Sequence, residues 1–247
     1  METGLRGRTA IVCGASAGIG LGCAEALAAE GANLVMLARG REALERESAR
    51  LGATAVPGDV RNPDDLERLV ATAVEQHGGA DILVLNSGGP PRTTALDATD
   101  EAARDAFELL FLSSIRLVRL CREHLERSGH GRVIAITSSS IKEPIDNLAL
   151  SNAIRPGLVG WLKTASRELG PAGVTVNAIA PGRIDTERLQ EVYPDGPSAA
   201  DLAAIALRRL GQPREIGDVV CFLASDRGAY VTGATIAVDG GLTRGLL

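Results

Sequence analysis

The stretch Thr9–Gly20 reads TAIVCGASAGIG and places three glycines, in the spacing G-x-x-x-G-x-G, directly after a short aliphatic run. The run has the composition of a buried strand, and a helical pattern follows the glycines. Glycine at such a junction permits a tight turn, close approach of the backbone to a pyrophosphate, and close packing of helix on strand. The helix N-terminus adds unpaired N–H groups for the phosphates. The stretch therefore predicts a dinucleotide-binding turn formed by Gly14, Ser16, Ala17, Gly18 and Ile19.

The rest of the chain alternates short aliphatic runs with longer helical patterns. The runs are Thr9–Cys13, Asn33–Ala38, Ala53–Val56, Asp81–Leu85, Arg132–Ile136, Val174–Ala178 and Thr235–Val238, and the main helical stretches are Arg41–Leu51, Pro63–His77, Asp100–Arg127 and Ala149–Leu169. This alternation predicts an α/β fold, a three-layer, Rossmann-like, doubly wound parallel sheet of about seven strands in a single domain over 1–247. Only Arg183–Ala200 lacks a period, and we expect a substrate loop at about 183–200.

Composition narrows the classes of function. The net charge is −5, and aromatic residues make up 2% of the 247 residues, so a core of Ala, Val, Leu and Ile is expected. An acidic chain without a basic stripe does not fit a nucleic-acid-binding protein. The four cysteines are far apart, which favours buried thiols in a reducing compartment and no metal site. With no signal peptide or apolar span in the sequence, we expect a cytoplasmic protein without membrane contact.

The end of the second predicted strand indicates which dinucleotide is bound. An acidic residue there would accept the ribose 2′-hydroxyl of NAD, whereas an arginine accommodates the 2′-phosphate of NADP. No acidic residue occurs between Ala32 and Arg41, and Arg39 stands at the position in question. The sequence therefore favours NADP(H) over NAD(H).

Further motifs extend over the whole chain. They are Asp59-Val60, the run DILVLNSG at 81–88, PGRIDT at 181–186, RLGQP at 209–213, VTG at 231–233 and VDGG at 238–241. Together with the glycine turn, the chain resembles the short-chain dehydrogenase/reductase superfamily, and most closely its 3-oxoacyl-(acyl-carrier-protein) reductase branch. The resemblance implies a homo-oligomer, a tetramer or a dimer. It also implies cofactor contacts at Asp59, Val60, Asn86, Gly88, Pro181, Gly182 and Ile184.

The residues that would perform the chemistry depart from this pattern. The family's catalytic set is Asn, Ser, Tyr and Lys, and Ser138 occupies its serine position. Ser151 and Arg155 stand where the tyrosine and lysine are expected, and Leu110 lies near the asparagine position. The resemblance therefore implies Ser138, Ser151 and Arg155 as the catalytic positions, with Arg155 also at the cofactor.

The replacement of the family's tyrosine and lysine by Ser151 and Arg155 changes the acid–base chemistry of the site. A phenol pKa near 10 can be lowered toward the working pH by a neighbouring cation, whereas the hydroxyl of Ser151 is a much poorer acid. Arg155 lies on the same helical face and keeps a permanent positive charge and a fork of donors, but exchanges no proton at neutral pH. Lys142, Asp146 and Tyr193 are alternative cleft residues, although surface placement is more typical of such residues.

Three functions remain open at this point. The first is an NADP(H)-dependent carbonyl/alcohol oxidoreductase of altered mechanism, acting on a small-molecule substrate. The second is a catalytically silent dinucleotide-binding protein that acts as a sensor or a partner subunit, and the third is a non-redox lyase or isomerase. For the oligomer, we expect contacts through Asp100–Arg127 and Ala149–Leu169, because Leu158, Val159, Trp161 and Leu162 group on the second helix.

Overall fold

In the computed structural model, which describes residues 2–193 and 195–245, seven parallel strands form one sheet in the order β3-β2-β1-β4-β5-β6-β7. The strands are β1 Thr9–Cys13, β2 Asn33–Ala38, β3 Thr54–Pro57, β4 Ile82–Leu85, β5 Arg132–Ile136, β6 Thr175–Pro181 and β7 Thr235–Val238. They are short and largely aliphatic, as expected of strands covered on both faces. The predicted fold class is confirmed; β1, β2, β5 and β7 have the predicted ends, and the ends of β3, β4 and β6 differ by one to three residues.

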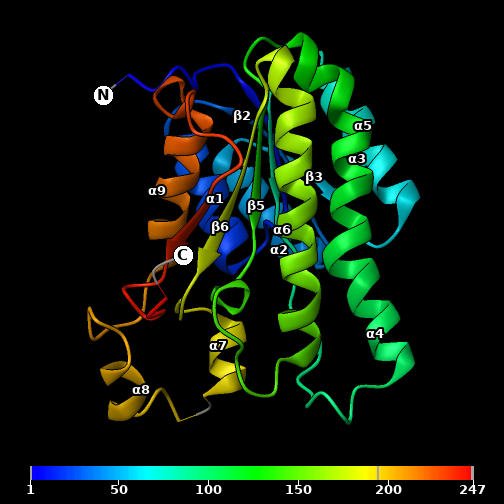
Figure 1. Cartoon of the computed structure of the whole chain (residues 1–247). Coiled ribbons are helices and arrows are strands. Elements are labelled where there is room, and N and C mark those ends of the chain that lie inside the picture. The colour runs from blue at the N-terminus through cyan, green and yellow to red at the C-terminus, as the bar shows by residue number, and fades with distance from the viewer. Residues whose placement is uncertain (1, 194, 246–247) are drawn as a thin grey trace.

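The order of the strands creates a switch point at the centre of the sheet. From β1 the chain moves outward through β2 to β3, and it then returns to the other side of β1 with β4. Connections on the two sides run in opposite directions, so a crevice opens at the carboxyl ends of β1 and β4. In Figure 1 this end of the sheet points down, toward α7 and α8.

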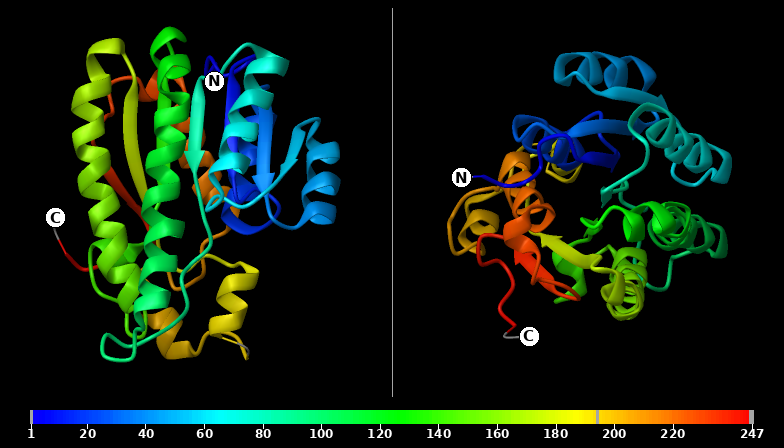
Figure 2. Two further views of the ribbon diagram at one scale, coloured as in Figure 1. Left: turned by 90° about the vertical axis from the view of Figure 1, so that its right-hand side faces the viewer. Right: turned by 90° about the horizontal axis from the view of Figure 1, so that it is seen from above.

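Helices cover both faces of the sheet (Figure 2). One face carries α1 Gly18–Ala29, α2 Arg41–Leu51 and α9 Pro213–Ala224, and the other carries α3 Pro63–His77, α5 Ser113–Arg127 and α6 Ala149–Leu169. The closest helix contact joins α1 to α9, where a Cβ on Gly217 would lie 2.3 Å from the carbonyl oxygen of Gly22. Glycine at both positions lets these two backbones approach closely and so packs α1 against α9.

Two predicted segments have a different structure. Asp100–Arg127 is not one regular helix, because a π-helical turn at Glu108–Leu112 separates α4 Asp100–Phe107 from α5. Arg183–Ala200 is not fully irregular, because it contains α7 Glu187–Val192 and the start of α8 Ala199–Ala203. Both short helices begin at a side-chain cap, Thr186 and Ser198. Helices of five or six residues are too short to show a period in the sequence.

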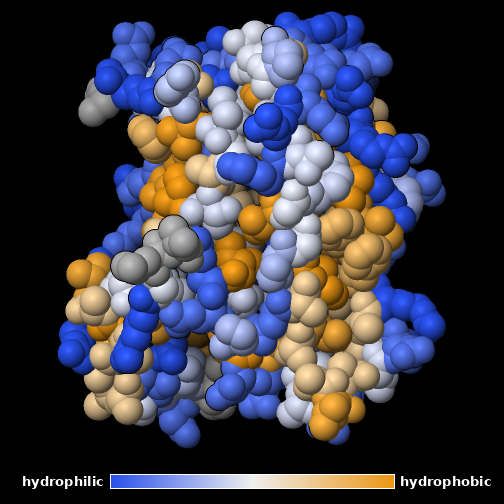
Figure 3. All heavy atoms as spheres, viewed as in Figure 1, coloured by the Kyte–Doolittle hydropathy of each residue, from blue (hydrophilic) through white to orange (hydrophobic). Residues whose placement is uncertain are grey.

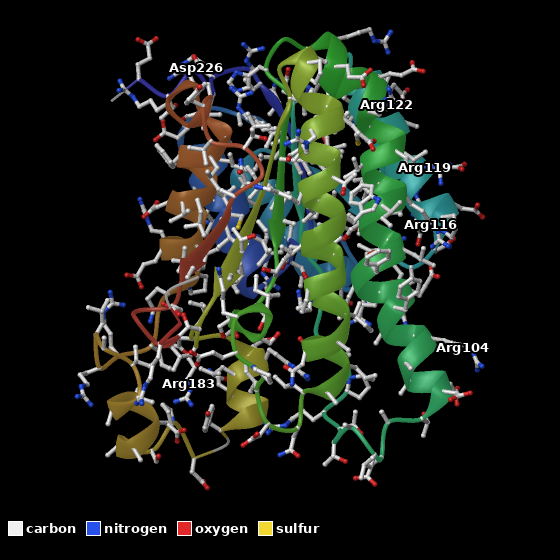
Figure 4. All side chains as sticks on the ribbon, in the orientation of Figure 1. Arg104, Arg116, Arg119, Arg122, Arg183 and Asp226 are labelled. Atoms are coloured by element: carbon white, nitrogen blue, oxygen red, sulfur yellow. The ribbon has the colours of Figure 1, made fainter. Side chains whose placement is uncertain are left out.

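The surface explains the arginine-rich composition. Arg104, Arg116, Arg119 and Arg122 follow one another along α4 and α5 (Figure 4), and two of them pair with an acid on the same helix, Arg104 with Asp100 at 3.4 Å and Arg122 with Glu126 at 2.8 Å. The four cysteines are buried and free. None of the helices described is both long and apolar enough to cross a membrane. Figure 3 shows hydrophobic residues gathered over α6 and its border with α5.

One part of the predicted oligomer surface is wrong. Leu158 and Leu162 are each 3% exposed and belong to the core between α6 and the sheet, so neither is available to a partner. Their spacing of four residues, continued by Leu169, places them on the inner face of the helix. Val159 and Trp161 are only partly buried.

Candidate cofactor and active site

A cavity of about 1570 Å³ occupies the carboxyl end of the sheet. It extends from the first turn of α1, past the ends of β4 and β5, to the loop that precedes α7. Every predicted site residue lines it: Gly14, Ser16, Ala17, Gly18, Ile19, Arg39, Asp59, Val60, Asn86, Gly88, Ser138, Ser151, Arg155, Pro181, Gly182 and Ile184. The structure thus brings these residues together around one cavity, and their individual roles stay predictions.

The glycine turn forms a cradle that no larger residue would fit. Gly14 has a φ of +60°, and a Cβ there would lie 2.7 Å from Nδ2 of Asn86. Asn86 in turn donates from Nδ2 to the carbonyl oxygens of Cys13 and Gly14, at 3.2 and 3.4 Å. Asn86 thus fixes the loop from the neighbouring strand and leaves the cavity side of the turn open.

The start of α1 leaves hydrogen-bond donors available to a phosphate. The N-cap residue Ala17 has no side chain that could cap the helix, and no acidic residue lies in the first turn. The first backbone N–H groups of a helix have no internal partner. Thr186 lies close by, because a Cβ on Gly18 would come within 3.3 Å of its Cγ2 atom. Sequence reasoning missed Thr186 as a residue of the cavity wall, although it belongs to the PGRIDT motif.

The part of the cavity beyond the ends of β2 and β3 is lined by two arginines with different surroundings. Arg61 holds the carboxylate of Asp59 through Nη2 at 2.7 Å and through its backbone N–H at 2.9 Å, and this contact lowers the pKa of Asp59. Arg39 is exposed at the rim and forms no ion pair with any described residue. Its guanidinium is therefore available to an anionic ligand.

The opposite wall is built by the end of β6. Gly182 donates from its backbone N–H to Val238 at 3.1 Å, and a Cβ there would lie 2.7 Å from the Cα of Asp239. Ile184 is buried and pairs with Gly211 as an isolated bridge. These contacts hold Pro181, Gly182 and Ile184 as a rigid side of the cavity.

The part of the cavity that is lined by the predicted catalytic residues contains a hydrogen-bonded pair, Ser151 and Arg155. Arg155 Nε donates to Ser151 Oγ at 3.2 Å, and Arg155 Nη1 donates to the carbonyl oxygen of Ile136 at 3.2 Å. Ser138 follows the same strand, β5, and its Oγ accepts the backbone N–H of Ser140 at 3.1 Å. The end of β5 therefore positions both Ser138 and the guanidinium of Arg155.

Arg155 is a cation held inside the protein without a carboxylate. Its residue is 8% exposed, and burial lowers its pKa to about 10, which still leaves it protonated at neutral pH. Its Nη2 atom has no acceptor among the described residues, although Arg155 lines the cavity. A buried charge without a partner is costly, so this donor is suited to ligand oxygens in the cavity.

A second, small cavity of about 10 Å³ lies behind Arg155. Arg155, Leu110, Ser113 and Ser114 are among the residues that line it. This volume corresponds to roughly one water molecule. Leu110 belongs to the π-helical turn and Ser113 and Ser114 follow it, and Ser113 Oγ donates to the carbonyl oxygen of Leu109 at 2.6 Å. Polar groups are thus present behind Arg155, although Leu110 itself carries none.

The loop between Ser138 and Ser151 is anchored to α6. Asn152 accepts from the backbone N–H of Ile145 at 3.1 Å and donates to its carbonyl oxygen at 2.9 Å. Glu143 in this loop accepts from the backbone N–H of Arg244 at 2.7 Å, which brings the C-terminal segment against the cavity. Leu242 and Thr243 of that segment line it.

The alternative proton donors are less suitably placed. Lys142 is exposed and does not line the cavity, whereas Asp146 is an exposed residue of its wall. Tyr193 donates to Asp201 at 3.3 Å, and burial raises the pKa of its phenol. Arg183, labelled in Figure 4, lies over the Tyr193 ring at 5.7 Å and pairs with Asp201 at 3.2 Å. Tyr193 lines the cavity, but its hydroxyl is engaged by Asp201 and it is a weak acid.

Comparison with known proteins agrees with this geometry. A family model described as enoyl-(acyl carrier protein) reductase matches residues 14–243. The chain is 35% identical over 242 residues to the 3-oxoacyl-[acyl-carrier-protein] reductase of Vibrio cholerae, with 96% of this chain and 98% of that protein covered. It is 33% identical over 244 residues to dehydrogenase/reductase SDR family member 4 of Sus scrofa, with 96% and 88% covered.

The chain belongs to the short-chain dehydrogenase/reductase superfamily. Among solved structures, L-sorbose reductase from Gluconobacter frateurii, complexed with NADPH and L-sorbose, superimposes with a TM-score of 0.92 at 30% identity, with 100% of both chains covered. YwfH, an NADPH-dependent reductase involved in bacilysin biosynthesis, gives a TM-score of 0.93 at 26% identity, covering 97% of this chain and 99% of that one. The family and the oxidoreductase class predicted from the motifs are confirmed.

Proposed function

We propose that this short-chain dehydrogenase/reductase is an NADP(H)-dependent enzyme that interconverts a carbonyl and an alcohol on a small molecule. Ser138, Ser151 and Arg155 would replace the family's serine, tyrosine and lysine as the groups around the substrate oxygen. The observation that carries the proposal is the hydrogen bond from Arg155 to Ser151 at 3.2 Å, in the cavity that also contains the glycine cradle.

The cofactor part rests on the two ends of the cavity. The cradle at Gly14 would be filled by a Cβ, and the open start of α1 suits a pyrophosphate. Arg39 forms no ion pair with a described residue and can contact a 2′-phosphate, and no acidic residue stands between Ala32 and Arg41 to accept a 2′-hydroxyl at the end of β2. Two structural relatives are described as binding or depending on NADPH, which agrees with this assignment.

The catalytic part rests on charge and on hydroxyl groups. When bound, the cofactor would supply or accept the hydride. Arg155 places a permanent cation and a free Nη2 donor beside Ser151. There it can bind ribose hydroxyls of the cofactor and stabilise negative charge on a substrate oxygen. Ser138 accepts the Ser140 N–H, so its own hydroxyl proton is available to the same oxygen. The pair of hydroxyls and the guanidinium would thus polarise a carbonyl without a phenol.

The experiment has two measurements. Calorimetry with NADPH tests binding, and single-turnover oxidation of NADPH with excess enzyme tests reduction of acetoacetyl-CoA, diacetyl and a panel of ketoses. We expect NADPH to bind and at least one carbonyl to be reduced, with loss of reduction in Ser151→Ala. Ser166→Ala is the matched control, because this serine is also buried on α6 but donates to the carbonyl oxygen of Lys163, away from the cavity. Binding without any reduction would instead favour a silent dinucleotide-binding protein.

A further inference from the structure

We propose that Ser140 is a positioning residue that directs the hydroxyl proton of Ser151 into the cavity, so that Ser151 acts as the proton donor to the substrate oxygen. The inference rests on the proposed reductase function and adds to it both a residue and a direction for the proton. Neither Ser140 nor a hydrogen bond between these two serines is suggested by the motifs of the sequence.

Ser140 lies directly behind Ser151. It belongs to the short turn Ser139–Ile141 after β5, and its backbone N–H is held by Ser138 Oγ at 3.1 Å. Its own Oγ lies 3.3 Å from Ser151 Oγ, and each of the two residues is 4% exposed. Ser151 lines the cavity, whereas Ser140 does not. A contact with substrate is therefore open to Ser151 and closed to Ser140.

The direction of the bond follows from what each hydroxyl can reach. Among the described residues, Ser151 Oγ is the only hydrogen-bond partner of Ser140 Oγ. If Ser151 donated to Ser140, the buried proton of Ser140 would have no acceptor, which costs free energy. If Ser140 donates to Ser151, the proton of Ser151 faces the cavity, where water or substrate can accept it. The second arrangement leaves no buried donor without a partner.

Arg155 completes the arrangement. The guanidinium has donors and no acceptor, so its contact with Ser151 Oγ at 3.2 Å is a donation. Ser151 Oγ then accepts one hydrogen bond from Ser140 and one from Arg155, which occupies both of its lone pairs. The remaining proton must point away from both donors. Ser151 is thus fixed as a donor, in contrast to an ordinary serine whose hydroxyl rotates freely.

The same contacts make the proton easier to release. Two donors, one of them cationic and buried, stabilise negative charge on Ser151 Oγ. In reduction, the carbonyl carbon would accept a hydride, with its two electrons, from bound NADPH to form the new C–H bond, and the carbonyl π electrons would move to the oxygen. That oxygen takes the proton of Ser151, and Ser151 recovers a proton from water in the open cavity. The products are the alcohol and NADP⁺, and one proton is consumed from solvent.

Neutron diffraction of deuterium-exchanged crystals tests the direction without any need for turnover. We expect the deuterium of Ser140 to point at Ser151 Oγ, and that of Ser151 to point into the cavity. A deuterium of Ser151 directed at Ser140 Oγ would overturn the inference. This result is independent of activity, so it distinguishes failure of the inference from failure of the proposed function, which would appear as the absence of carbonyl reduction by the wild-type protein.

Kinetics supply the second readout. In Ser140→Ala, we expect kcat for the carbonyl probe that the wild type reduces to fall by roughly 10- to 100-fold, because a misdirected acid loses part of the contribution of general acid catalysis. The Kd for NADPH should not change, and the solvent deuterium isotope effect on kcat should rise. Ser140→Thr keeps the hydroxyl and should recover much of the rate, and Ser166→Ala again serves as control. Equal kcat values in wild type and Ser140→Ala would contradict the role of Ser140.

Discussion

Arg155 Nε donates a hydrogen bond to Ser151 Oγ across 3.2 Å, between side chains that lie one helical turn apart on α6. The family pattern implies a tyrosine and a lysine at these positions, and there too an acidic hydroxyl would be paired with a cation. The spacing of four residues keeps both groups on one face of the helix. Serine is a weaker acid than tyrosine, and arginine keeps its charge more firmly than lysine does. Cofactor binding would therefore be preserved, whereas proton transfer to the substrate would be weakened.

Cofactor selection can be tested at the rim of the cavity. Arg39→Ala should weaken NADPH binding by about tenfold and leave NADH binding unchanged, because one charged hydrogen bond to the 2′-phosphate is lost. Arg41→Ala is the matched control, since Arg41 is nearby but paired with Glu45 at 3.2 Å. Calorimetric titration with both cofactors measures the effect. Equal affinity of the wild type for NADPH and NADH would refute the assignment.

Removal of the buried Arg155 cation should lower the affinity of the protein for NADPH without lowering its thermal stability. In Arg155→Met, we expect Tm to stay level or rise, because the variant no longer carries an unpaired charge into the interior. NADPH binding should weaken by at least about tenfold, because the guanidinium donors of a residue that lines the cavity are lost. Thermal melts and titration on the same sample test both statements. A lower Tm with unchanged affinity would show that Arg155 is only a structural residue.

The oligomer is predicted to form through α4, α5 and α6. Phe107 is 42% exposed there and stacks on Phe111 at 4.9 Å between centroids, and Trp161 and Val159 are partly exposed on α6. Gly160→Glu tests the contact, because a Cβ at Gly160 meets nothing within 4 Å in the single chain. We expect a dimer or tetramer for the wild type by light scattering, and dissociation in the variant. Gly170→Glu, equally unobstructed at the end of α6, should leave the mass unchanged.

Stability should depend on pH through His130. This residue is 2% exposed at the opposite end of the sheet from the cavity, where Figure 4 labels Asp226, and its Nδ1 lies 3.1 Å from an Asp226 carboxylate oxygen. Burial, followed by the charge of Arg132, lowers the pKa of His130. The unfolded chain therefore binds a proton at a higher pH than the folded chain. The free energy of unfolding should fall as the pH drops below the ordinary histidine pKa of 6.5.

Urea unfolding at a series of pH values between about 5 and 8 measures this dependence. His130→Phe should flatten the curve in that interval, whereas a substitution of the exposed His77 should leave it unchanged. A wild-type protein that becomes more stable as the pH falls from 7 would contradict the stated direction of the pKa shift.

Regular elements could be predicted because their signals are local. The bounds of α2, α3 and α6 agree with the predicted stretches, and Asn62, Pro63 and Gly78 mark the ends of α3 as an N-cap, a first-turn proline and a left-handed C-cap. The cofactor cradle was also predictable, since its glycines follow one another in the chain. The π-helical turn at Glu108–Leu112 was not, because its residues have ordinary helical composition.

The contact between Ser140 and Ser151 could not be predicted either. The two serines are eleven positions apart and joined by an anchored loop, and their spacing in the sequence does not reveal where a hydroxyl points. The exposure of Leu158 and Leu162 was predicted wrongly for a related reason. Their apolar character does not say which face of α6 meets the sheet until the neighbouring strands are placed.

The most direct test of the account is the single-turnover rate of NADPH oxidation with a 3-oxoacyl thioester in three proteins. They are the wild type, Ser151→Ala, and the double variant Ser151→Tyr with Arg155→Lys. We predict a slow but measurable rate for the wild type, a clear loss in Ser151→Ala, and a gain in the double variant, because positioned acid–base groups contribute about 10²- to 10⁴-fold to rate. Efficient turnover by the wild type, unchanged in Ser151→Ala, would contradict the account, since another residue would then act as the proton donor.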